Sequence, residues 1–202
     1  MHADLVGVLE RLSLVGEWNN STVMVRAFVA LELPGEIKNR LKEAQEKFRD
    51  CPARLTFVEP ALIHITLKFL GEVAEKDLPL VSAALRSISF RPFPATVGTV
   101  TVNNPKRPRT VWCTVSEGGE GKKLFQLVEE VLAPLGFGRE ARGFTPHATL
   151  ARVKTPDPAL FTVLRALEGT AYGDCMIRGM KLKKSTLTPK GPVYEDLLEV
   201  VW

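Results

Sequence analysis

One order of secondary-structure patterns occurs twice in this sequence, and the repeat restricts the possible folds more than any other feature. Strand-like alternation over Val23–Leu33 is followed by an amphipathic helix, a short apolar strand, a second helix and another strand. The same order begins again at Thr110. The repeat is therefore the organising feature of a chain whose 202 residues suit one domain or two small lobes.

The expected elements differ in hydrophobic period. Strands with alternating or β-branched residues are expected at Val23–Leu33, Leu55–Val58, Ile63–Leu70, Phe93–Val102, Thr110–Ser116, His147–Val153, Met176–Leu187 and Val193–Val201. Helices with apolar residues three and four apart are expected at 34–51, Glu75–Ser87, Gly121–Leu135 and 158–167. Gly71 is expected to end the strand before it. Residues 1–23 are expected to form an N-terminal extension of uncertain role.

The short strand of each repeat carries the same tetrapeptide, His-x-Thr-Leu, at His64–Leu67 and at His147–Leu150. Side chains alternate along a strand, so the histidine and the threonine of each motif point to one face. A single motif of this kind is more often a half-buried core position than a catalyst. Two copies at corresponding places, which use two of only three histidines, make that interpretation much weaker.

Two such strands facing each other would place two imidazoles and two hydroxyls around one small group. Hydrolysis of a phosphodiester needs a base for water and an acid for the leaving oxygen, and histidine titrates near neutral pH. Two histidines divide these roles when one is protonated and the other neutral. Threonine hydroxyls donate hydrogen bonds to the non-bridging oxygens. The scheme requires no metal ion, and the sequence has no obvious metal site.

Charge, apolar runs and cysteine positions argue against several other classes of protein. A formal charge of +4 is too small for a protein that coats nucleic acid, but suits one that binds a single anionic group. No apolar run approaches the roughly 20 residues of a membrane helix, and charged residues interrupt the start of the chain, where a secretory signal would be continuous. Cys51, Cys113 and Cys175 are odd in number and far apart, which argues against a disulfide framework or a thiolate zinc site. A cytoplasmic protein is expected.

The paired motifs and their flanks resemble the 2H phosphoesterase superfamily. Within it, the sequence is similar to the RNA 2',3'-cyclic phosphodiesterases, which are also named 2'-5' RNA ligases. The resemblance covers Met24–Trp202. The segments that carry it are Arg26–Ala30, His64–Val73 (HITLKFLGEV), Arg109–Trp112, Phe144–Arg152 (FTPHATLAR) and Ser185–Tyr194.

The resemblance implies an α+β fold with two pseudo-symmetric lobes, each with an antiparallel sheet and flanking helices, and an active-site cleft between them. Residues 24–202 would form this single bilobal domain. It also implies metal-independent opening of an RNA terminal 2',3'-cyclic phosphate to a 2'-phosphomonoester, without a cofactor. His64 is assigned as general acid and His147 as general base, with Thr66 and Thr149 as phosphate ligands.

Two further site residues are candidates. Arg152 resembles the family's positively charged phosphate ligand, but strict alternation puts it opposite His147 and Thr149, so a phosphate contact needs a bulge. Phe144 is a candidate for stacking on a terminal base, as is Trp112. Core packing is expected for Phe69.

Three groups of basic residues are expected to be solvated faces that guide an RNA backbone only where they lie on the cleft rim. These groups are Arg107/Arg109, Arg139/Arg142 and Lys181/Lys183/Lys184.

The sequence therefore predicts a monomeric RNA 2',3'-cyclic phosphodiesterase that acts on RNA ends, with tRNA fragments as candidate substrates and no membrane partner. Three alternatives stay open. One is reversible 2'-5' ligation of tRNA halves by the same histidines. The second is another 2H specificity, such as a small cyclic nucleotide. The third is an RNA-end binding module without turnover.

Overall fold

The computed structural model describes residues 23–189 and 191–202, so the expected extension lies outside them except for Val23. The nine strands of this part are β1 (Met24–Glu32), β2 (Arg54–Phe57), β3 (His64–Ala74), β4 (Phe93–Val102), β5 (Thr110–Ser116), β6 (His147–Thr155), β7 (Gly173–Ile177), β8 (Gly179–Thr188) and β9 (Gly191–Val201). The α-helices are α2 (Gly35–Glu46), α3 (Leu78–Arg86), α4 (Glu120–Leu132) and α5 (Ala159–Ala166). Short 3-10 helices are η1 (Pro60–Leu62), η2 (Glu75–Asp77) and η3 (Ala133–Leu135). None of the helices described is long and apolar enough to cross a membrane.

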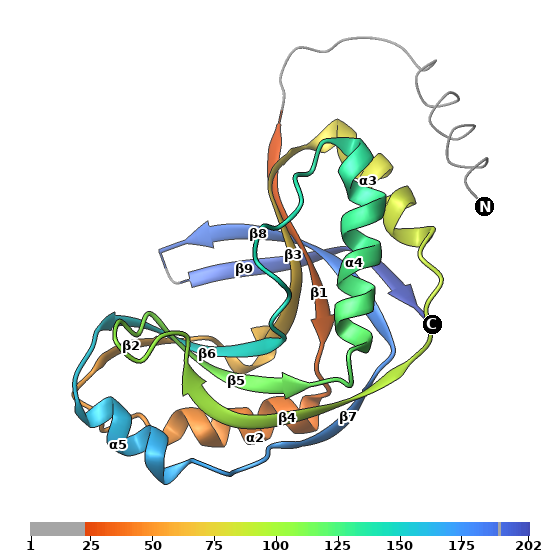
Figure 1. The fold of residues 1–202 in the computed structure, drawn as a ribbon. Coiled ribbons are helices and arrows are strands. Elements are labelled where there is room, and N and C mark those ends of the chain that lie inside the picture. Colours follow the sequence, from red (N-terminus) through yellow and green to blue (C-terminus); the bar gives the residue numbers. More distant parts are fainter. Residues whose placement is uncertain (1–22, 190) are drawn as a thin grey trace, which may run out of the picture.

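The strands form an antiparallel arrangement of two halves, which confirms the expected α+β class (Figure 1). The strand order is β7-β4-β5-β6-β3-β1-β8-β9, and β2 pairs with β6. The two halves meet where β3 pairs with β6, and the residue pair recorded there is Ile65 with Ala148. The central strands of the sheet are therefore the two that carry the His-x-Thr motifs.

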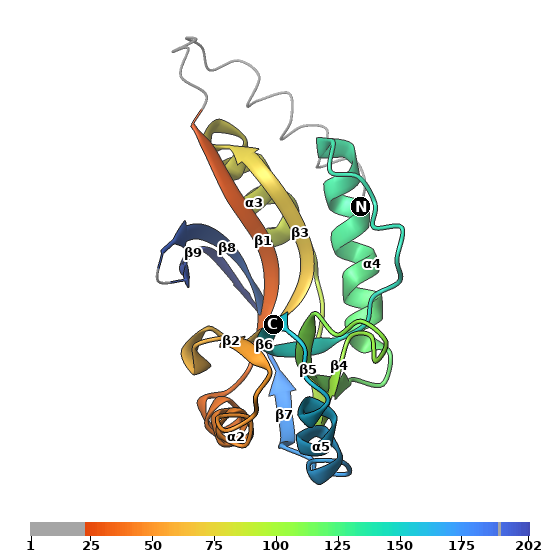
Figure 2. The same ribbon diagram turned by 90° about the vertical axis from the view of Figure 1, so that its left-hand side faces the viewer.

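Each half of the sheet is built from both repeats of the chain. The last strand of the first repeat, β4, pairs with β5 of the second repeat, whereas β8 returns to pair with β1. The helices also cross: α4 packs on β3 and α3, while α2 contacts β6. Figure 2 shows α3 and α4 beside β1 and β3, with α2 and α5 at the other end. The expected repeat is confirmed, but its elements are exchanged between the halves.

Two expected strand boundaries are wrong. β3 continues through Gly71 to Ala74, because Gly71 adopts a left-handed φ of 73° at a bulge instead of ending the strand. The segment Met176–Leu187 is divided into β7 and β8, which pair with different halves of the sheet. Gly179 lies at this change of partner, and a Cβ there would be 2.2 Å from the Val200 carbonyl oxygen. Only glycine fits this close approach.

Candidate active site

The register between β3 and β6 brings the two motifs together. Ile65 and Ala148, the middle residues of the motifs, form the recorded pair, and both are buried in the core. Continued in the antiparallel direction, this register sets His64 opposite Thr149 and Thr66 opposite His147. Opposed side chains share a face, with Cβ atoms about 4.5–5.5 Å apart. The two imidazoles and two hydroxyls therefore lie on one face of the sheet.

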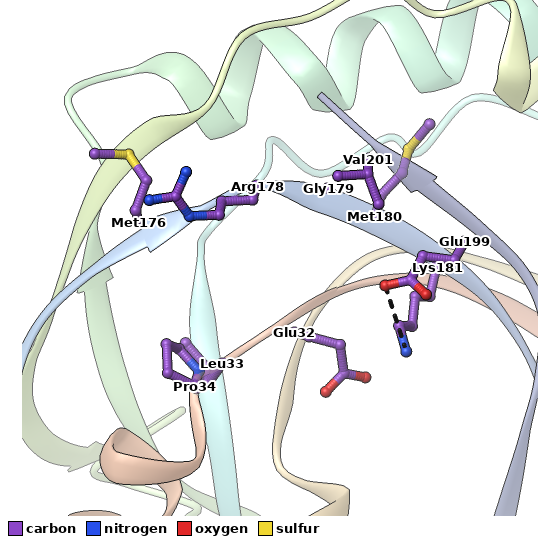
Figure 3. Close-up of a pocket in the computed structure, with 10 residues that line it drawn as sticks. All are labelled: Glu32, Leu33, Pro34, Met176, Arg178, Gly179, Met180, Lys181, Glu199 and Val201. Atoms are coloured by element: carbon purple, nitrogen blue, oxygen red, sulfur yellow. Dashed lines mark ion pairs between the residues drawn. The ribbon is translucent and has the colours of Figure 1, made fainter.

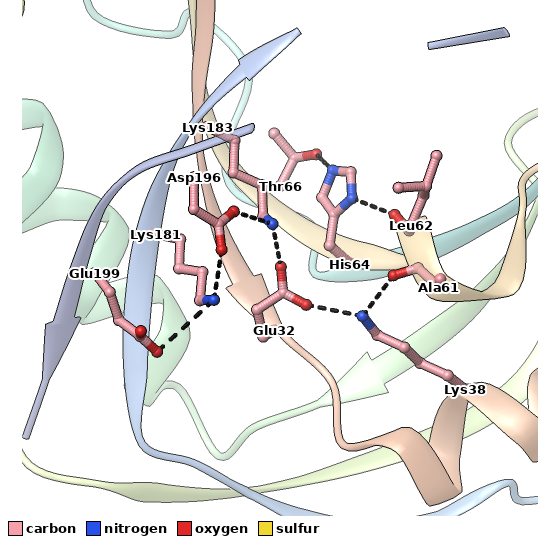
Figure 4. A network of polar contacts seen from close by, with 10 residues as sticks. All are labelled: Glu32, Lys38, Ala61, Leu62, His64, Thr66, Lys181, Lys183, Asp196 and Glu199. Atoms are coloured by element: carbon pink, nitrogen blue, oxygen red, sulfur yellow. Dashed lines mark hydrogen bonds and ion pairs between the residues drawn. The ribbon is translucent and has the colours of Figure 1, made fainter. Parts of the chain in front are cut away.

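Both histidines are held in the same way by the backbone. The Nδ1 atom of His64 lies 2.7 Å from the Leu62 carbonyl oxygen, and that of His147 lies 2.7 Å from the Thr145 carbonyl oxygen. A carbonyl only accepts, so each Nδ1 carries the proton and each Nε2 is the atom available for chemistry. The Nε2 of His64 lies 3.1 Å from Thr66 Oγ1 (Figure 4). Each imidazole can therefore exchange a proton through Nε2 without losing its orientation.

Aromatic rings pack against both histidines. Phe28 and Tyr194 lie against His64, with ring centroids 4.9 and 5.5 Å away. Trp112 lies against His147 at 4.1 Å. Burial lowers the pKa of both histidines below the ordinary value. In the unliganded protein, both therefore lose their protons more readily than an exposed histidine.

The charges around the two histidines differ. Glu32 lies opposite His64 in the register of β1 and β3, and its carboxylate raises the pKa of His64 against the larger effect of burial, while Lys183 and Lys38 lower it. For His147, burial is the main cause of the lowered pKa. The charge of Arg152 lowers this pKa further. Charges of both signs therefore act on the pKa of His64, whereas the charge that acts on the pKa of His147 is a cation, which favours its neutral form.

Glu32 belongs to a chain of ion pairs across β1, β8 and β9 (Figure 4). Its carboxylate accepts from Lys38 at 2.8 Å and pairs with Lys183 at 2.6 Å. Lys183 and Lys181 each pair with Asp196 at 2.6 Å. The sequence pattern does not indicate a role for Glu32, because its partners come from distant parts of the chain. All three lysines of the Lys181/Lys183/Lys184 group are ion-paired, but the expected solvated face is wrong for Lys183, which is buried between its partners Glu32 and Asp196.

A cavity of about 270 Å³ lies beside this network (Figure 3). Its lining includes Glu32, Lys181 and Glu199 and, from the region where β7 passes into β8, Met176 and Arg178. Neither motif histidine nor threonine lines it. The cavity is therefore separate from the face that carries the motifs.

Arg152 reaches the motif face through a bulge. Trp112 pairs with Thr149 but Val111 pairs with Ala151, which leaves Leu150 as the extra residue. Arg152 pairs with Thr110, two residues from Trp112, so it lies on the same face as Thr149. Its Nη1 donates to Thr110 Oγ1 at 3.2 Å. The bulge that a phosphate contact requires is present, and the contact itself stays a prediction.

The first motif strand has a matching bulge. Ala30 pairs with Thr66 and Val29 with Lys68, so Leu67 is the extra residue, as Leu150 is in β6. Phe69 is the counterpart of Arg152 and is 57% exposed, so the expectation of core packing is wrong. Because the bulge reverses the alternation after Leu67, Phe69 turns to the motif face, where its ring lies 6.1 Å from that of Phe28. An exposed aromatic ring therefore borders the first motif.

Phe144 packs against α4. Its ring stacks on Phe125 at 5.3 Å and 11°, and it is only partly exposed. The ring contact recorded for it is with the core and not with either histidine. Base stacking by Phe144 stays a prediction, and one ring face is already covered.

Among the residues that the structure describes, no cluster of three or more His, Cys, Asp or Glu could hold a metal ion. The candidate site consists of two imidazoles, two hydroxyls and a guanidinium. This set can transfer protons and bind an anion.

Comparison with known proteins identifies the family of this chain. The sequence model of the LigT-like phosphoesterase family matches residues 31–112 and 116–194. A protein of Archaeoglobus fulgidus, named RNA 2',3'-cyclic phosphodiesterase, is 37% identical over 174 residues, which cover 86% of this chain and 98% of that protein. One of Thermus thermophilus with the same name is 38% identical over 188 residues, covering 86% and 88%.

Solved structures agree with the fold. A crystal structure of a Thermus thermophilus protein has a TM-score of 0.75 and 30% identity, and covers 87% of this chain and 97% of its own. Escherichia coli LigT complexed with 3'-AMP has a TM-score of 0.72 and 23% identity, covering 89% and 98%.

Proposed function

The chain belongs to the LigT-like phosphoesterase family, and from this premise we propose that it opens the 2',3'-cyclic phosphate at an RNA end to a 2'-phosphomonoester without a metal ion. The observation that carries the proposal is the pairing of Ile65 with Ala148, because this register sets both His-x-Thr motifs on one face. The name of the relatives supplies the substrate class.

The reaction assigned to the site needs only proton transfers and anion binding. His147 takes a proton from water through Nε2 as the water oxygen forms a bond to phosphorus. The bond between phosphorus and the 3' oxygen breaks, and His64 gives its Nε2 proton to that oxygen. The products are a 2'-phosphomonoester and a 3'-hydroxyl. Thr66 and Thr149 donate hydrogen bonds to the non-bridging oxygens, where negative charge increases in the transition state.

The division of roles follows from the neighbouring charges. Glu32 raises the pKa of His64 against the effect of burial, and no such carboxylate acts on the pKa of His147. Burial lowers the pKa of both histidines, so the assignment rests on the one difference in charge between them, the carboxylate that acts on His64 alone. His64 is therefore the acid and His147 the base.

Other parts of the proposal concern the whole protein. Residues 24–202 act as one catalytic domain, a view supported by the exchange of strands between the repeats. The acting form is a cytoplasmic monomer, and tRNA fragments are candidate substrates.

The first experiment uses a short RNA with a terminal 2',3'-cyclic phosphate in excess chelator, followed by identification of the end group. We expect a 2'-phosphate to form at the same rate with and without chelator, because no proposed step uses a metal ion. Loss of turnover in chelator would contradict metal independence. A joined RNA would indicate ligation, and RNA that stays unchanged in both conditions would contradict the proposed activity.

Replacing Glu32 with glutamine tests the assignment of roles. Without the carboxylate, the pKa of His64 falls further, because only the hydrogen bond to the Leu62 carbonyl still opposes burial and the charges of Lys183 and Lys38. The acid must be protonated, so the alkaline limb of the kcat/KM profile should move to lower pH while the acidic limb stays in place. The measurement is a pH–rate profile on cyclic-phosphate RNA.

The control for this prediction is Glu199→Gln, which removes a carboxylate of the same network that does not act on the pKa of His64. Its profile should match that of the unmodified protein. If Glu32→Gln moves the acidic limb to lower pH instead, the assignment is reversed and His64 is the base.

A further inference from the structure

A second cavity, of about 620 Å³, shares Arg152 with the motif face. It lies between the turn that precedes β5 and the end of β6. We call it the basic pocket. Its lining residues are Arg107, Pro108, Arg109, Thr110, Arg152, Val153, Lys154 and Pro156.

The lining of the basic pocket has one sign of charge. Four of its eight residues are cations, namely Arg107, Arg109, Arg152 and Lys154, and none is acidic. None of the four takes part in an ion pair within the described residues, although the lysines beside Glu32 are all paired. Unpaired like charges gathered around a cavity repel one another and attract an anion. The pocket is therefore suited to a negatively charged ligand.

The turn that carries two of these arginines is held in place by asparagine side chains. Asn103 Oδ1 accepts from the backbone N–H of Arg109 at 2.9 Å and of Thr110 at 3.0 Å. Asn104 Oδ1 accepts from the N–H of Lys106 at 2.9 Å and of Arg107 at 3.3 Å. These bonds fix the backbone from which the arginines project, so less ordering is needed when an anion binds.

Arg152 belongs to both the basic pocket and the candidate active site. It lines the pocket and lies on the same face as Thr149. Its charge also acts on groups of the other lobe: burial raises the pKa of Tyr194, and Arg152 opposes that rise. An anion in the pocket would therefore be a close neighbour of a phosphate held between the histidines. A nucleic-acid strand carries neighbouring phosphates that can occupy two adjacent sites, whereas a mononucleoside cyclic phosphate carries one phosphate.

We propose that the basic pocket binds an internal phosphate of the RNA strand whose terminal cyclic phosphate lies between His64 and His147. This inference rests on the proposed function and extends it, because it makes an RNA strand, and not a cyclic mononucleotide, the preferred substrate. Phosphate contacts of this kind position a strand without reading its sequence. The preference should therefore depend on chain length and on salt more than on base identity.

The test compares two substrates in the double variant Arg107→Gln/Arg109→Gln. We expect kcat/KM for a short RNA with a terminal 2',3'-cyclic phosphate to fall about tenfold, and the slope of log KM against log salt to decrease by about 0.7 for each lost phosphate contact. Turnover of a 2',3'-cyclic mononucleotide should stay unchanged. The matched control is Arg86→Gln/Arg91→Gln, which removes two exposed arginines outside the pocket and should alter neither substrate.

Three outcomes would overturn the proposal: no change on the RNA, an equal loss on both substrates, or an equal loss in the control variant. Binding of the same RNA by fluorescence anisotropy separates this proposal from the proposed function. If the protein turns over neither substrate, the proposed function fails. The basic pocket is then judged by RNA binding alone, which should weaken in the Arg107→Gln/Arg109→Gln variant.

Discussion

Turnover of RNA cyclic phosphate should fall by at least about 100-fold when His147 is replaced with alanine, because a positioned general base contributes about 10²–10⁴-fold. The Thr145 carbonyl holds the imidazole in one orientation, and the other histidine of the site is assigned to the opposite proton transfer. His64→Ala should cause a loss of similar size, since it removes the proton donor for the 3' oxygen. The double variant should be little worse than the poorer single variant, because the two residues act as a unit.

Single-turnover kinetics with saturating protein measure the chemical step of these variants, and thermal unfolding reports whether the fold is kept. The control is His2→Ala, which changes the chain's third histidine and lies outside the motifs. We expect it to match the unmodified protein. Activity near the unmodified level in either His64→Ala or His147→Ala would contradict the two-histidine mechanism.

The essentials of the candidate site could be predicted because they are local and occur twice. A period of two along each short strand is enough to put His64 and Thr66 on one face, and the second copy is what favours a catalytic role over a half-buried core position. The place of Arg152 could not be predicted. It depends on the bulge at Leu150, which alternation in a single strand does not reveal. The corresponding bulge at Leu67 in β3 explains why Phe69 is exposed.

Partners between distant strands could not be predicted. The spacing of apolar residues identified β4 and β5 with their observed bounds, but nothing in it indicated that β4 would leave its own repeat to pair with β5. The run Met176–Leu187 reads as one strand because strand propensity continues across Arg178, whereas the change of partner is set by tertiary packing at Gly179. The ion pairs of Glu32 depend on the same long-range pairing.

Lys68 and Glu129 form a buried ion pair that ties the first motif strand to α4. Lys68 follows the bulge in β3, and its Nζ donates to Glu129 at 2.5 Å and to the Gly138 carbonyl at 2.7 Å. The two side chains are only 2% and 6% exposed. The second carboxylate oxygen of Glu129 accepts from the Glu140 N–H at 3.2 Å. The pair therefore joins β3, α4 and the loop after it.

Glu129→Ala should lower the free energy of unfolding by about 3–5 kcal/mol, because it leaves the Lys68 ammonium buried without its counter-charge. Denaturant unfolding measures the change. The control on the same helix is Glu120→Ala, which breaks an exposed pair with Lys123 and should cost less than about 1 kcal/mol. The double variant Lys68→Met/Glu129→Leu should recover most of the loss, because apolar residues of similar volume avoid burying a charge. If Glu129→Ala costs no more than the control, the pair does not hold β3 on α4, and the position of His64 depends on the sheet alone.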